Sequence, residues 1–72
     1  MAYKFYSGPL DVVTVSERAN GGERTIARAT NFHLGCRWRL HVFGDPQPDQ
    51  DVTNIIHDHA ALSALIDKRR RA

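Results

Sequence analysis

The chain has a single cysteine and no long apolar run. One cysteine cannot form an intramolecular disulfide, and no stretch has the length of a membrane span or the layout of a signal peptide. We therefore expect a cytoplasmic protein with no membrane partner. The cysteine and the four histidines show no pair at chelating spacing. We expect no metal site and no cofactor.

The chain is also short, at 72 residues. A domain of this size buries only roughly 60 % of its unfolded surface, so its core is thin. A homodimer, or folding helped by a partner, is a reasonable expectation. A pocket on the order of 300 Å³, which a small-molecule substrate would need, is hard to build in so small a domain. We expect one domain over residues 1–72, with no catalytic residues and no enzymatic activity.

The net charge of +2 conceals a segregation of charge along the sequence. Residues 1–44 carry six basic and three acidic side chains, residues 45–67 carry five aspartates and no lysine or arginine, and residues 68–71 are four consecutive cations. Such alternation gives strong local fields without a uniformly basic surface.

The segment from Cys36 to Phe43 alternates apolar and cationic side chains. In a β-strand this period of two sends Cys36, Trp38, Leu40 and Val42 to one face, with Trp38 as the expected core anchor. The other face then carries Arg37, Arg39, His41 and Phe43.

Strands are predicted at about 2–6, 10–18, 23–32 and 36–43. Asn20-Gly21 predicts a hairpin with a type I′ turn, but its register has two solutions. A two-residue turn pairs Glu17 with Arg24, Arg18 with Glu23 and Val15 with Ile26, which matches charges and is slightly favoured. A three-residue turn pairs Val15 with Ala27 and Val13 with Ala29, which builds a better apolar face.

A helix is predicted at about 52–68, after a loop whose two prolines forbid helix and sheet pairing. Asp51 is the expected N-cap, and apolar residues recur at helical spacing behind it. A basic tail at 68–72 ends the chain. The fold class is therefore α+β: a three- or four-stranded antiparallel meander with one C-terminal helix packed on the face that bears Trp38, Leu40 and Val42.

His59 falls on the apolar stripe of the predicted helix. It could titrate in the core, or form a nucleophile pair with Cys36 across the interface. The favoured interpretation is a histidine hydrogen-bonded to a backbone carbonyl or to Ser63.

Two basic groups are candidate partner-binding residues. Arginines two apart on a strand project about 6.6 Å from one another, close to the spacing of phosphates along a nucleic-acid strand. A solvated sheet face is the simpler explanation of that row. The candidates are Arg37, Arg39, His41 and Phe43 on the strand, and Lys68, Arg69, Arg70 and Arg71 at the chain end.

These features favour a non-enzymatic small binding protein. We expect an inhibitor or modulator, of the kind that phages and mobile elements encode, which docks on a protein or a nucleoprotein complex. Segregated charge favours this function, since five aspartates would repel DNA over much of the surface. The alternative is a direct DNA- or RNA-binding module that uses the sheet-face arginines and the basic C-terminal tail on phosphates.

Overall fold

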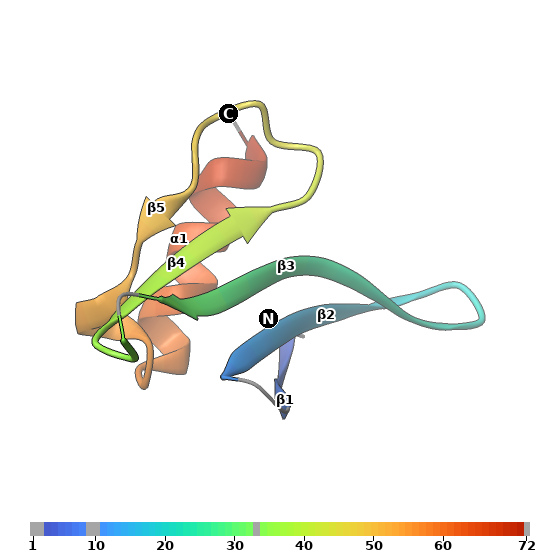
Figure 1. Ribbon diagram of the computed structural model, residues 1–72. Coiled ribbons are helices and arrows are strands. Elements are labelled where there is room, and N and C mark those ends of the chain that lie inside the picture. The colour runs from blue at the N-terminus through green and yellow to red at the C-terminus, as the bar shows by residue number, and fades with distance from the viewer. Residues whose placement is uncertain (1–2, 9–10, 33, 72) are drawn as a thin grey trace.

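The protein forms two layers, a five-stranded antiparallel sheet and one helix packed on one face of it (Figure 1). This computed structural model describes residues 3–8, 11–32 and 34–71. The strands follow one another across the sheet in chain order, β1 to β5. In chain order, the elements are β1 (Tyr3–Gly8), β2 (Val12–Ala19), β3 (Gly22–Phe32), β4 (Arg37–Val42), β5 (Gln50–Asp51), the 3₁₀ turn η1 (Thr53–Ile55) and α1 (His59–Arg71).

The predicted α+β class is confirmed, and so is the C-terminal helix on one face of an antiparallel sheet. The predicted number of strands is one short, because the loop with two prolines returns to pair Gln50 and Asp51 with Leu40 and Arg39. The four predicted strands differ from the observed ones by a residue or two at their ends. The predicted bounds at residues 2, 10 and 72 lie outside the described residues.

The β2–β3 hairpin contains both predicted registers. Near the turn, Glu17 pairs with Arg24 and Arg18 with Glu23, as the two-residue turn requires. Beyond a register shift at Val15/Ser16, Val15 pairs with Ala27 instead of Ile26. Ile26 is thus the extra residue of a β-bulge, and its carbonyl accepts a hydrogen bond from the Phe43 amide at 2.9 Å. The bulge lets the charges match at the tip and the apolar residues match at the base.

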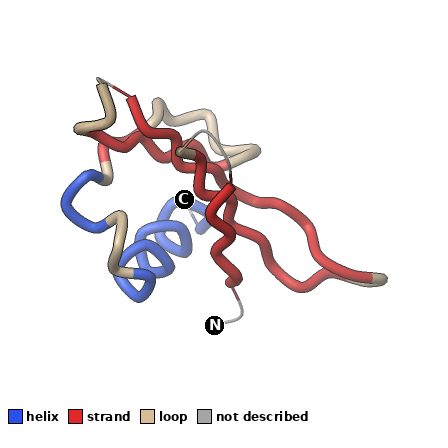
Figure 2. Tube along the Cα trace, turned by 60° about the horizontal axis from the view of Figure 1, so that its bottom comes forward, coloured by secondary structure: helices blue, strands red, loops and turns tan. Residues whose placement is uncertain are grey.

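The hairpin turn is not of the predicted type I′. A type I′ turn needs positive φ at both central residues. Gly21 has a φ of +83°, but Asn20 is not among the positive-φ residues. This φ pattern is that of a type II turn, which needs a glycine only at its second central position. The hairpin projects away from the helix as an open arm (Figure 2).

The core lies between the sheet and α1. Leu40 and Val42 are almost fully buried, as predicted, and they belong to one cluster with Leu62 and Ile66 of α1. Trp38 is only half-buried at the margin of this cluster. The other core residues are Val15, Ile26, Ala27, Ala29, Val52 and Ile56.

The expectation that Cys36 faces the core is wrong. Cys36 precedes β4 in an exposed turn, where the strand alternation does not yet apply.

The predicted helix at 52–68 is wrong in its first two turns. The chain forms the short η1 turn after Val52, and α1 begins only at His59. The expected N-cap role of Asp51 is wrong: Val52 is the N-cap of η1 and makes no side-chain cap hydrogen bond, and Asp51 lies in β5, where its carboxylate accepts a hydrogen bond from the Thr53 amide. Asp58 caps α1, since its carboxylate accepts from the Ala61 amide. The expected basic tail is the last turn of α1, where cations complement the helix dipole.

Candidate docking face of the sheet

The sheet face opposite α1 is covered by no helix or strand within the described part of the chain (Figures 1 and 2). The register of β3 and β4 sets Arg28 opposite His41, Thr30 opposite Arg39, and Phe32 opposite Arg37. These side chains alternate with the buried Ala27, Ala29, Leu40 and Val42, so they project to the uncovered side. We call this surface the outer face; its residues are Arg28, Thr30, Phe32, Arg37, Arg39, His41 and Phe43.

Aromatic rings support the arginines of the outer face. The Arg39 guanidinium carbon lies 4.3 Å from the centroid of the Phe32 ring, and that of Arg28 lies 5.5 Å from the centroid of Phe43. The His41 ring meets Phe43 edge-on, at 5.2 Å between centroids. Cation–π contacts of this kind hold a guanidinium in a defined position without neutralising its charge.

Carboxylates from the loop and β5 neutralise one side of the outer face. Arg37 donates to Asp51 at 2.8 Å, and His41 and Asp49 are joined by a 2.8 Å contact. Hydrogen bonds from Thr53, together with Arg37, lower the pKa of Asp51 to about 2, so its charge persists. This pairing requires the loop to return to β4.

Arg28 and Arg39 have no carboxylate partner among residues 3–8, 11–32 and 34–71. Since Arg28 pairs with His41 across the strands, and Arg39 lies two residues from His41, the two arginines are diagonal neighbours. Sequence reasoning missed Arg28. The signal was present, because Arg28 stands between the two small apolar residues Ala27 and Ala29.

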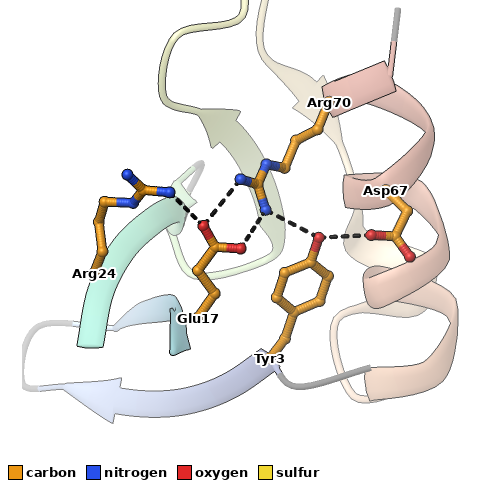
Figure 3. Close-up of polar contacts among 5 residues, drawn as sticks. All are labelled: Tyr3, Glu17, Arg24, Asp67 and Arg70. Carbon is orange, nitrogen blue, oxygen red and sulfur yellow. Dashed lines mark hydrogen bonds and ion pairs between the residues drawn. The ribbon is translucent and has the colours of Figure 1, made fainter. Parts of the chain in front are cut away.

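The structure separates the four C-terminal cations from the outer face, since they lie on α1. Arg69 is buried, and its Nε donates to Asp45 at 2.7 Å while its Nη2 donates to the carbonyls of Gln47 and Pro48. Arg70 binds Glu17 and the Tyr3 hydroxyl (Figure 3). Both of these arginines therefore hold the fold together. Lys68 and Arg71 are exposed and have no carboxylate partner among the described side chains.

His59 and Cys36 do not form the hypothesised nucleophile pair. The His59 ring stacks on Phe5, with centroids 4.2 Å apart and planes 12° apart. Cys36 is exposed in the turn before β4, and its sulfur contacts the Leu34 carbonyl at 4.0 Å.

A groove of about 460 Å³ between β1 and α1 is lined by a serine, a histidine and an aspartate, but these three are not arranged as a catalytic triad. His59, Ser63 and Asp67 succeed one another at one-turn spacing on α1, which sets His59 and Asp67 about 12 Å apart along the axis. Asp67 thus lies too far away to orient His59, and it accepts a 2.6 Å hydrogen bond from Tyr3 instead. In a catalytic triad the carboxylate accepts a hydrogen bond from the histidine, and this contact is not made between Asp67 and His59.

Two further features, a metal site and a membrane-spanning helix, were also sought among the described residues. No group of three or more histidine, cysteine, aspartate or glutamate side chains gathers as a metal site in these residues. No described helix is long and apolar enough to cross a membrane.

The chain matches no protein-family model, no curated protein and no solved structure.

Proposed function

We propose that this chain is a non-enzymatic binding protein that docks on a protein or nucleoprotein partner through its outer face, as a small inhibitor or modulator does. The observation that carries this proposal is the pair Arg28 and Arg39, two cations on an uncovered sheet face. Phenylalanine rings support them, and no carboxylate of the described residues pairs with them. Solvation alone explains why this face carries charged side chains. It does not explain why two guanidinium groups are held in place by phenylalanine rings.

The composition of the outer face supports a macromolecular partner. Arginine and aromatic side chains are enriched among the residues that dominate binding energy in protein interfaces. The Phe43 ring contacts His41 and the Arg28 guanidinium, yet Phe43 is still 40 % exposed, so apolar area remains for a partner to bury. Rigid rings and stacked guanidinium groups also lose little conformational entropy on binding.

Direct binding of DNA or RNA is the second candidate, and the same two arginines favour it. A guanidinium suits a phosphate as well as a carboxylate. Against it, Asp51 lies directly opposite Arg39, and Asp49 contacts His41, which lies opposite Arg28. A phosphate backbone that crosses the face toward β5 would meet both carboxylates.

The test is affinity capture from a lysate of the source cells, with two charge-reversal variants compared. The first variant, Arg28→Glu/Arg39→Glu, alters the outer face. The matched control, Lys68→Glu/Arg71→Glu, makes the same change of charge on α1. We expect the first variant to lose a partner that the wild type and the control both retain, after thermal unfolding has shown that both variants fold.

A nuclease-treated lysate separates the two candidates. Capture of a protein that survives nuclease supports docking on a protein, whereas loss of all capture on nuclease treatment favours nucleic acid as the anchor. Equal capture by the wild type and by the outer-face variant would overturn the proposal. A loss confined to the α1 variant would move the docking surface to the helix.

A further inference from the structure

β1 is the edge strand of the sheet, and within the described residues it pairs only with β2 (Figure 1). The outer edge of such a strand carries backbone N–H and C=O groups that can pair with a further strand. Natural edge strands commonly prevent this pairing with a proline, a β-bulge or a charged side chain, lysine above all. β1 contains no proline, and its register with β2 runs from Tyr3 to Gly8 without a shift.

The one charged side chain of β1 is drawn away from this edge. Lys4 forms an ion pair with Glu23 at 2.9 Å, and the Tyr6 hydroxyl donates to the same carboxylate at 2.8 Å. Glu23 lies on β3, beyond β2, so both side chains lean back across the sheet. The lysine therefore gives the edge of β1 little protection against pairing.

The groove between β1 and α1 provides room for the side chains of an added strand. Its volume is about 460 Å³, and its lining includes Phe5 of β1 and the small residues Ala60 and Ala64 of α1. One carboxylate, that of Asp67, lines it and already accepts a hydrogen bond from Tyr3. An added strand would place alternate side chains on the α1 side of the sheet, over this groove. Uncharged side chains suit those positions.

We propose that the added strand is β1 of a second copy of this chain, paired antiparallel with Phe5 opposite Phe5 of the second copy. Tyr3 and Phe5 contact α1, and the alternation of the strand places Ser7 on the same side. None of these three side chains carries a charge at neutral pH. A copy of β1 therefore suits the groove, and a two-fold axis makes the interface self-complementary.

Charge and apolar contact select this register. Directly opposite residues of an antiparallel pair point to the same side, so a symmetric pair of β1 strands can be centred on Lys4, on Phe5 or on Tyr6. Centring on Lys4 sets two lysines opposite each other, which is destabilising. Centring on Tyr6 sets Phe5 opposite Ser7 and loses apolar contact over the groove. Centring on Phe5 sets the two phenylalanines together, with Lys4 opposite Tyr6 and Tyr3 opposite Ser7.

Such a dimer joins two sheets into one. Both copies of α1 then lie on one side of the joined sheet, and both outer faces lie on the other. Ala60 and Ala64 are exposed, and their small side chains allow the two helices to approach. The docking proposed above would then be bivalent, although the dimer does not depend on that docking.

The first experiment is sedimentation equilibrium of the full chain over a range of concentrations. We expect a reversible equilibrium between monomer and dimer with a dissociation constant on the order of micromolar, since five paired residues on each strand make a small interface. A chain that stays monomeric up to about 1 mM, far above that constant, would overturn the inference.

A pair of variants with the same change of charge locates the interface. Ala64→Glu places a carboxylate in the groove at an exposed helix position, and should raise the dissociation constant at least about tenfold, because the dimer buries that charge unpaired. Gln47→Glu makes the same change in the exposed loop before β5, and should alter the constant by less than about twofold. Thermal unfolding shows first that both variants fold. A dimer that Ala64→Glu leaves intact would overturn the inference.

Disulfide cross-linking tests the register, in chains whose native cysteine is removed by Cys36→Ser. In the register centred on Phe5, Lys4 lies directly opposite Tyr6 of the second copy, with Cα atoms about 4.5–5.5 Å apart, which a disulfide can span. Two copies of the same residue, Lys4 or Tyr6, are diagonal neighbours about 7–8 Å apart, which a disulfide does not span. A mixture of Lys4→Cys and Tyr6→Cys chains should therefore cross-link, whereas neither chain should cross-link alone. Cross-linking of Lys4→Cys alone, or of Tyr6→Cys alone, would overturn the proposed register.

Discussion

The carboxylate of Glu17 on β2 binds the guanidinium of Arg70 on α1 through two hydrogen bonds, of 2.7 and 3.0 Å (Figure 3). Arg24 donates to the same carboxylate at 2.7 Å from the neighbouring strand. The Tyr3 hydroxyl accepts from Arg70 and donates to Asp67, which connects β1 to the helix as well. The basic end of the chain therefore fastens the helix across the sheet.

This clamp predicts a loss of stability in acid. Hydrogen bonds from Arg70 and then from Arg24 lower the pKa of Glu17 from 4.5 to about 2. A carboxyl group whose pKa is lower in the folded state stabilises the fold above its unfolded pKa, and this stability is lost as the pH falls from about 4.5 toward 2. Thermal unfolding followed by circular dichroism should show a falling midpoint over that interval.

Glu17→Gln should lower the midpoint at neutral pH and flatten its dependence on acid. The control is Glu23→Gln, whose partner Lys4 is 64 % exposed, so its contribution should be smaller. Asp51, with a pKa of about 2, keeps some acid dependence in both variants. An acid profile that Glu17→Gln leaves unchanged would contradict the clamp.

The buried ion pair of Arg69 and Asp45 predicts that substitution of Arg69 lowers stability far more than substitution of its neighbour Lys68. Both side chains are 5 % exposed, and their ion pair ties the end of α1 to the loop before β5. Removal of one member leaves the other charge buried without compensation, which is strongly destabilising. Arg69→Met should therefore lower the unfolding midpoint far more than Lys68→Met, at the exposed neighbouring position. Equal effects would show that the pair contributes no more than a surface charge.

The core predicts that Leu40 matters more than Trp38. Leu40 has an exposed fraction of 0 %, at the centre of the contact between the sheet and α1. Leu40→Ala should cost about 2–5 kcal/mol of unfolding free energy, which is enough to unfold many small domains. Trp38→Ala should cost less, because the indole is only half-buried at the margin. Denaturant unfolding of both variants measures the order, and the reverse order would restore tryptophan as the anchor.

The sequence predicted the local elements well because their signals are local. Alternation placed Leu40 and Val42 inside and Arg37, Arg39 and His41 outside, as found. The hairpin carried two conflicting signals, charge matching near Glu17 and apolar matching near Val15. Both signals were correct, but they can be combined only with a bulge at Ile26. No residue type predicts a bulge as strongly as glycine predicts a turn.

The errors came from long-range contacts and from a helical pattern without a helix. Val52 and Ile56 fit the apolar stripe of the predicted helix, yet they reach the core from the two positions that flank η1. The break falls at Asp58, whose side chain caps α1 where a continuous helix was expected.

The candidate site depended even more on contacts distant in sequence. Whether a cation is available is decided by which carboxylate the fold brings to it. Asp51 reaches Arg37 and Asp45 reaches Arg69 only because the loop after β4 folds back. From sequence spacing alone, Arg37 and Arg69 were therefore predicted to be partner-binding residues just as Arg39 was.

Leu34 predicts a gain of stability from a polar substitution. It occupies the turn before β4 with a φ of +57°, a left-handed conformation that costs a branched residue about 1 kcal/mol. Its side chain is 100 % exposed and so gains nothing from burial. Leu34→Asn should raise the unfolding free energy by about 0.5–1 kcal/mol, since asparagine tolerates this conformation, whereas Leu34→Ala should give no such gain. Denaturant unfolding tests the pair, and a loss of stability in Leu34→Asn would mean that the leucine makes a contact that stabilises the fold.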